Sequence, residues 1–270
     1  MLARSPLWAD PRRQPPCGSV RINYAHPLAR DLLALWLFNE GSGLPYNLVT
    51  GATGSSTSAP IWTTGPAGIG LEGNHDVRIR CPLRGPSSAA AATMAAGFVA
   101  SATASYYSLF TAAPGDGSVQ GLHLSGTAGN PMAFTWDATS GEYNAATGLT
   151  VPLGSVCATA AALTAVGNGS PYQQILRSPT GILTYQGTQQ MFARSLMSDW
   201  YLGAYSGAFG SREWHGTVYW AGLWTRTFSS DHLGWVTDEP YALLEPIIRR
   251  RYFHGVTAAQ FRSITIAGAA

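Results

Sequence analysis

The sequence is poor in charged residues and contains no lysine. Of its 270 residues, 14 are acidic and 16 are basic, and every basic residue is an arginine. Charged residues therefore make up 11% of the chain, against about 25% in an ordinary soluble protein. Two interpretations stay open: partners cover much of the surface, or Ser, Thr, Asn and Gln make it polar. The net charge of +2 is too small to indicate nucleic-acid binding.

Cysteines and long apolar runs are also scarce. The odd number and wide spacing of Cys17, Cys81 and Cys157 argue against a disulfide framework and against a zinc site. No apolar run is long enough to span a membrane, and residues 1–20 lack the apolar core of a signal peptide. We therefore expect a protein that is assembled inside the cell and has no membrane partner.

Patterns of catalytic and metal-binding residues are missing as well. Glycoside hydrolases need two carboxylates that flank the sugar bond, but no two of the 14 acidic residues stand at positions i and i+2. The six histidines show no metal-ligand spacing, and no G-x-S-x-G segment is present. Asn74, Asp76 and Asp116 stand near glycines, which favours turns over a calcium site because neither segment supplies a second carboxylate. We expect no enzyme activity, no metal and no cofactor.

The residues that are abundant indicate an all-β protein. Hydrophobic residues make up 46% of the chain, and 31 glycines and 17 prolines supply turns between short strands. Residues 34–38 predict a strand that is apolar on both faces, with Trp36 on one face and Leu35 on the other. Residues 215–224 predict a similar strand near the other end of the chain. We expect these two strands to lie in one β-sandwich and to close it.

Further strands and one helix complete the predicted body. Segments with strand-like patterns, separated by turn residues, lie at 76–81, 94–99, 106–110, 132–136, 156–163, 175–176 and 182–185. The one convincing helix begins after Ser229 or Ser230, because either hydroxyl can cap its first turn. Leu233 and Val236 are then expected to face the sheet.

Both ends of the chain have the composition of extended arms around a body at residues 26–246. Prolines in residues 1–25 exclude a regular helix or central strand, and residues 247–270 follow the completed sandwich as an arm able to pair with a sheet edge. The candidate assembly contacts in these arms are Trp8, Arg12, Arg13, Arg249, Arg250, Arg251, Tyr252 and Phe253. The basic and aromatic cluster among them could also contact nucleic acid, although we favour a protein interface.

The order of these segments resembles the laminin-G-like, or concanavalin-A-like, jelly-roll family. The resemblance is carried by residues 28–43, by the glycine-rich turn and strand at 68–79, and by the segments 202–204, 214–218 and 223–229. It implies a two-sheet antiparallel jelly-roll sandwich with one short C-terminal helix. Taken together, the segments look like the version of this domain found in bacteriophage virion proteins.

This resemblance implies a non-enzymatic structural protein of a phage particle, either a capsid decoration or a part of a tail or fibre. Such a protein would be made in the host cytoplasm, lie at the virion surface, and bind other virion proteins and further copies of itself. The alternative is a carbohydrate-binding adhesin module that attaches to a host glycan. Its candidate contacts are Trp62, Trp200 and Trp214, which lie near turns where sugar rings could stack on them.

Overall fold

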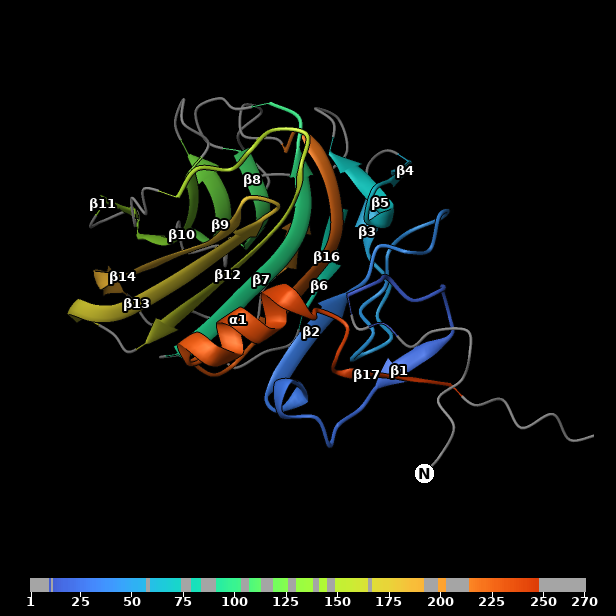
Figure 1. Ribbon diagram of the computed structural model, residues 1–270, viewed down its shortest axis with the longest axis horizontal. Helices are drawn as coiled ribbons and strands as arrows, with labels where there is room; N and C mark the ends of the chain where they lie inside the picture. Colours follow the sequence, from blue (N-terminus) through green and yellow to red (C-terminus); the bar gives the residue numbers. More distant parts are fainter. Residues whose placement is uncertain are drawn as a thin grey trace, which may run out of the picture.

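Two antiparallel β-sheets pack face to face and form most of the molecule (Figure 1). The computed structural model describes residue 10 and residues 12–56, 59–73, 79–83, 91–102, 107–112, 119–125, 130–137, 141–144, 149–164, 167–191, 199–202 and 214–247. These residues form seventeen strands, one α-helix, α1 (Ser230–Asp238), and one 3-10 helix, η1 (Pro27–Ala29). The predicted all-β sandwich with one short helix near the C-terminus is confirmed.

The larger sheet runs in the order β14-β13-β12-β7-β16-β5-β4, and β2 pairs with β16 beside that path. Its strands are β2 (Leu32–Trp36), β4 (Ile61–Gly65), β5 (Gly68–Gly73), β7 (Ala91–Ala100), β12 (Val156–Thr164), β13 (Gly167–Ser178), β14 (Gly181–Met191) and β16 (Gly216–Trp224). The smaller sheet runs in the order β11-β10-β9-β8-β15-β6-β3. Its strands are β3 (Ser55–Ser56), β6 (Ile79–Pro82), β8 (Tyr107–Ala112), β9 (Val119–Ser125), β10 (Asn130–Asp137), β11 (Gly141–Asn144) and β15 (Asp199–Leu202).

The early strand β2 and the late strand β16 lie side by side in the larger sheet. They pair antiparallel, with Trp36 opposite Ala221, and β16 also pairs with β7 on its other edge. The prediction that these two segments close one sandwich is therefore confirmed. This pairing brings together segments from near the two ends of the described chain.

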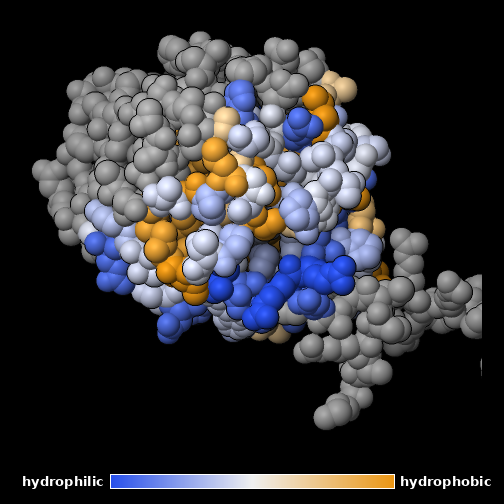
Figure 2. All heavy atoms as spheres, turned by 45° about the horizontal axis from the view of Figure 1, so that its top comes forward, coloured by the Kyte–Doolittle hydropathy of each residue, from blue (hydrophilic) through white to orange (hydrophobic). Residues whose placement is uncertain are grey.

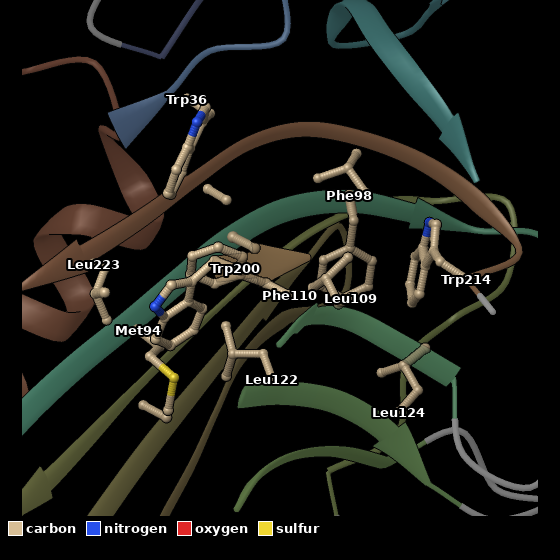
Figure 3. Close-up of a cluster of buried hydrophobic side chains, with 14 of the residues drawn as sticks. Trp36, Met94, Phe98, Leu109, Phe110, Leu122, Leu124, Trp200, Trp214 and Leu223 are labelled. Carbon is tan, nitrogen blue, oxygen red and sulfur yellow. The ribbon is translucent and has the colours of Figure 1, made fainter. Parts of the chain in front are cut away.

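The space between the two sheets is filled by aromatic and aliphatic side chains (Figure 3). Trp36 packs edge-on against Phe110 of the smaller sheet, with ring centroids 5.3 Å apart, and Phe110 lies 4.4 Å from Trp200 by the same measure. Burial of rings of this size contributes strongly to stability because each removes a large apolar area from water. The face of β2 that carries Trp36 therefore lies in the sandwich core, as its sequence pattern predicts.

A second apolar cluster covers part of the outer face of the larger sheet. Leu35 lies in this cluster together with Leu233 and Val236 of α1, so the predicted second face of β2 and the predicted sheet-facing side of the helix are both confirmed. The Ser229 hydroxyl caps α1 by accepting a hydrogen bond from the backbone N–H of His232. Figure 1 shows α1 (orange) lying across this sheet.

The segment at residues 12–22 lies against the body of its own chain. Within it, β1 (Val20–Ile22) pairs antiparallel with β17 (Leu244–Pro246) near the end of the described chain. The side-chain amide of Gln14 donates to the carbonyl oxygens of Leu37 and Ile69, at 2.8 and 2.7 Å. Part of the stretch predicted as an N-terminal arm is thus bound to the sandwich, whereas residues 248–270 of the predicted C-terminal arm lie outside the described residues.

Candidate functional site

The outer face of the larger sheet has a region that carries polar side chains in place of the apolar cluster. The strand registers place Glu72 of β5 opposite Thr217 of β16, and Thr217 opposite Val99 of β7. Residues opposite each other share a face of the sheet. Leu71 lies in the core between the sheets, so its neighbour Glu72 points to the outer face. The same cross-strand row continues to Val156 of β12, which is opposite Val99.

A cavity of ≈ 410 Å³ opens over this row. Four strands and the segments at the ends of β7 and β16 supply its walls. The lining residues are Thr63, Glu72, Gly73, Val99, Ser101, His215, Gly216 and Thr217. Three hydroxyls, one carboxylate and one imidazole can therefore donate or accept hydrogen bonds in this space. The volume is within the range of about 300–1,000 Å³ that is typical of small-molecule sites.

Two glycines shape the rim of this cavity. Gly216 has a φ of +138°, in a region that other residues rarely adopt, and a Cβ there would collide with the carbonyl oxygen of Val99. A Cβ on Gly73 would collide with Trp214. Beside them, the carbonyl oxygen of His215 accepts a hydrogen bond of 3.0 Å from the N–H of Ser101. These constraints fix the backbone that carries His215 and Thr217.

A second, smaller hollow of ≈ 150 Å³ lies on the same face near the C-terminal end of α1. Asp238 forms ion pairs there with the guanidinium groups of Arg12, at 3.0 Å, and Arg177, at 3.1 Å. Val156 lines this hollow, and its partner Val99 lines the cavity. The two depressions are therefore neighbours on one sheet face. Figure 2 shows, on the face that it draws, apolar side chains (orange) beside strongly hydrophilic ones (blue).

The prediction that Trp200 and Trp214 could be exposed glycan contacts is wrong. Both side chains are 0% exposed. Trp200 packs against Phe110, and Trp214 packs edge-on against Phe98 with ring centroids 5.3 Å apart; both lie in the core shown in Figure 3. A buried indole presents no face to a sugar, so these two tryptophans serve the core.

The third predicted glycan contact, Trp62 of β4, is half-buried. Its ring packs against the core, and its indole N–H donates to the carbonyl oxygen of Gly43 at 3.1 Å. It stands opposite Leu71, on the face of the sheet away from the cavity. Trp62 is thus not brought together with the polar row, and its role as a glycan contact remains a prediction.

The predicted assembly contacts are described only in part. Arg12 is exposed and makes its ion pair with Asp238 of its own chain, and Arg13 is also exposed. The remaining candidates, Trp8 and residues 249–253, lie outside the described residues, as do Asn74, Asp76 and Asp116 of the two segments weighed for calcium. The assembly role of these residues remains a prediction.

Acidic and metal-ligating residues are sparse around the cavity. Among the described residues that line the cavity, Glu72 is the one carboxylate, whereas glycoside hydrolases use a pair. In the described part of the chain, no group of three or more His, Cys, Asp or Glu side chains could hold a metal ion. The lining groups are suited to hydrogen bonding with a neutral, polar ligand.

The sequence did not single out Glu72 or Thr217, and it indicated for His215 only that the six histidines show no metal-ligand spacing. These residues come from separate strands, and only the strand register brings them together. The one usable local signal was alternation: polar Thr217 precedes buried Val218, and polar Glu72 follows buried Leu71. Such alternation indicates an outward-facing side chain but does not say which strands are neighbours.

Comparison with known proteins places the fold among β-sandwich domains. No protein-family model and no curated protein sequence matches the chain. Among solved structures, domain 4 of AbnA, an extracellular GH43 arabinanase from Geobacillus stearothermophilus, in complex with arabinotriose, is similar with a TM-score of 0.59 and 16% identity. The match covers 77% of this chain and 98% of that domain.

The sialidase of Trypanosoma rangeli, in complex with sialic acid, is similar with a TM-score of 0.52 and 10% identity. That match covers 79% of this chain but 33% of the sialidase, so the chain corresponds to one part of that larger protein. At these identities the likeness shows the fold alone, which is that of a β-sandwich domain. As a separate observation, no helix in the described residues has the length and apolar character to cross a membrane.

Proposed function

We propose that this chain is a non-catalytic carbohydrate-binding module and that its ligand lies in the outer-face cavity. The observation that carries the proposal is the ≈ 410 Å³ cavity itself, in which Glu72, His215 and Thr217 converge on one face of a β-sandwich. The fold comparison supports it, because the similar domain of the arabinanase has been solved with arabinotriose. The module would therefore recognise a neutral, polar glycan by its hydroxyl pattern.

The lining groups match the chemistry of a sugar ring. The carboxylate of Glu72 can accept hydrogen bonds from two neighbouring hydroxyls, and the hydroxyls of Thr63 and Thr217 can either donate or accept. Val99 supplies an apolar surface for the C–H face of the ring. Since a site built to hydrogen-bond hydroxyl groups rejects ligands that lack them, this arrangement favours a sugar over an apolar ligand.

The small number of carboxylates among the described lining residues of the cavity supports binding without catalysis. Hydrolysis of a glycosidic bond requires a general acid together with a nucleophile or general base, and both are usually carboxylates. Only Glu72 is available among the described lining residues. A module of this kind would bring another protein, or a particle that carries it, to a polysaccharide surface.

A glycan array probed with the purified protein tests the proposal. We expect binding to a limited group of neutral oligosaccharides, and about tenfold or weaker binding for Glu72→Gln, since a hydrogen bond to a charged group contributes about 1.5–3 kcal/mol. Glu245→Gln is the matched control, because Glu245 lies on β17 and pairs with Arg21. An array without binding, or equal losses in both variants, would contradict the proposal.

The structural role in a phage particle, which the sequence resemblance implies, remains a prediction. None of the comparisons bears on it, and its candidate contacts at residues 249–253 lie outside the described residues. The two roles are compatible, because a glycan-binding domain can be carried on a particle. Association of the chain with purified particles, with and without residues 247–270, is the measurement that bears on it.

A further inference from the structure

Strand β14 is the long free edge of the larger sheet. It is 11 residues long and ends the strand order, whereas the strands at the other ends, β4, β11 and β3, have 5, 4 and 2 residues. The free edge of β2 is occupied by its own loop: Leu35 donates to the Asn47 side chain, and Leu48 donates to the Leu35 carbonyl oxygen. Within the described residues no strand pairs with the outer edge of β14.

The composition of β14 lacks the features that usually protect an edge strand. Natural edge strands tend to be short or to carry charges, proline or a bulge, because unpaired backbone groups invite pairing with another chain. Residues 181–191 include no charged residue and no proline. Ile182 and Leu183 are 49% and 44% exposed, and as successive residues of a strand they point to opposite faces. Both faces of this edge therefore expose apolar area.

We propose that β14 pairs antiparallel with β14 of a second copy of this chain, so that two larger sheets become one continuous sheet. Ser178 and Gly181 are paired across a two-residue turn, so the backbone groups of Ile182, Thr184 and Gln186 point to the free edge. A two-fold axis at Thr184 places Ile182 opposite Gln186 of the second copy. It also places Leu183 opposite Tyr185 of the second copy, which covers the exposed leucine.

A second copy fits this edge better than a foreign strand. An uncharged strand can pair with itself without placing like charges opposite each other, and a two-fold contact closes on itself without growing into a fibre. The axis passes through the sheet, so both outer faces lie on the same side of the dimer. The cavity lies over β4, β5, β16 and β7, away from β14. Pairing therefore leaves both cavities open, and the proposal does not depend on what they bind.

Sedimentation velocity over a range of concentrations tests this pairing. We expect the wild-type chain to be a dimer and both Thr184→Lys and Thr184→Glu to be monomers, because each change places like charges across the two-fold axis. An equimolar mixture of the two variants is expected to recover the dimer, since a lysine then faces a glutamate. Recovery of the dimer in the mixture would show that residue 184 lies at the axis. Two variants that had merely lost stability would not recover the dimer on mixing.

A second pair of variants separates edge pairing from folding. Thr184→Pro removes an outward N–H that β13 does not use, and is expected to abolish the dimer while thermal unfolding of the monomer is little changed. Thr184→Val retains the N–H and should leave the dimer intact. A monomeric wild-type chain at all concentrations would overturn the proposal, as would a dimer that persists in Thr184→Lys. If Thr184→Pro fails to fold, the two charged variants decide the question.

Discussion

At the scale of single residues, the side chain of Gln14 fills a gap in the larger sheet. Strand β16 is bordered by β5 along its first half and by β2 along its second half. Between them, the Gln14 amide bonds the carbonyl oxygens of Leu37 and Ile69, and its oxygen accepts from the Ile69 N–H at 2.9 Å. One side chain thus satisfies backbone groups that no strand reaches at this junction.

Replacing the Gln14 amide with a carboxylate tests this role. Gln14→Glu loses the donor and places a carboxylate against two carbonyl oxygens, so we expect the free energy of unfolding to fall by about 1–3 kcal/mol or more. Urea denaturation measures the change. Ser42→Glu, which adds the same carboxylate at an exposed position, is the control and should stay within about 0.5 kcal/mol of the wild type. Equal effects at both positions would contradict the assigned role.

His26 is expected to make stability depend on pH. Its Nδ1 accepts the Leu28 N–H at 3.2 Å, which requires a neutral ring, and burial beside Trp235 lowers the pKa of His26 despite the opposing charge of Glu239. A lowered folded-state pKa gives stability that is complete above the ordinary pKa of about 6.5 and is lost as the pH falls from there through the lowered pKa of the folded state. His26→Asn retains a capping group that does not titrate.

The measurement for His26 is the difference in unfolding free energy between wild type and His26→Asn across that pH range. We expect the free energy of unfolding of the wild type to fall relative to that of His26→Asn as the pH falls below about 6.5. Other titrating groups are common to both proteins and cancel in the comparison. A difference that stays constant with pH would show that the His26 ring is protonated equally in the folded and unfolded chains.

At the scale of elements, local signals predicted more than long-range placement. The cap at Ser229, the buried side of α1 and the two apolar faces of β2 follow from short patterns, and the structure confirms them. The exposure of Trp200 and Trp214 was not predictable, because burial depends on which strands pack above them. The cavity was missed for the same reason: its lining residues become neighbours only when β5, β16 and β7 pair in register.

The Ser229 cap gives a prediction for α1 as a unit. Ser229→Ala removes the hydroxyl that accepts from the His232 N–H, and we expect a loss of about 1 kcal/mol in the free energy of unfolding. Ser229→Asp should retain most of the stability, because its carboxylate can cap the helix and suits the positive end of the helix dipole. Thermal denaturation of both variants checks the ranking, and a reversed order would contradict it.

At the scale of the whole molecule, the fold divides the larger sheet into regions with different roles. One face packs against the smaller sheet, part of the other face is covered by α1 and residues 12–22, and the remaining part carries the cavity and the smaller hollow. The apolar clusters hold the two sheets together, so we expect substitutions in the polar row of Glu72 and Thr217 to leave the fold intact. This separation is what makes selective binding variants possible.

The most direct test of the account fills the cavity and measures binding of the best array ligand by titration calorimetry. Thr217→Trp introduces a large ring over the outer-face row, outside the core. We expect the affinity to fall by at least about tenfold, or 1.4 kcal/mol, while thermal stability is retained. Thr180→Trp, in the exposed turn between β13 and β14, should bind as the wild type does. Unchanged affinity in a folded Thr217→Trp protein would contradict the account.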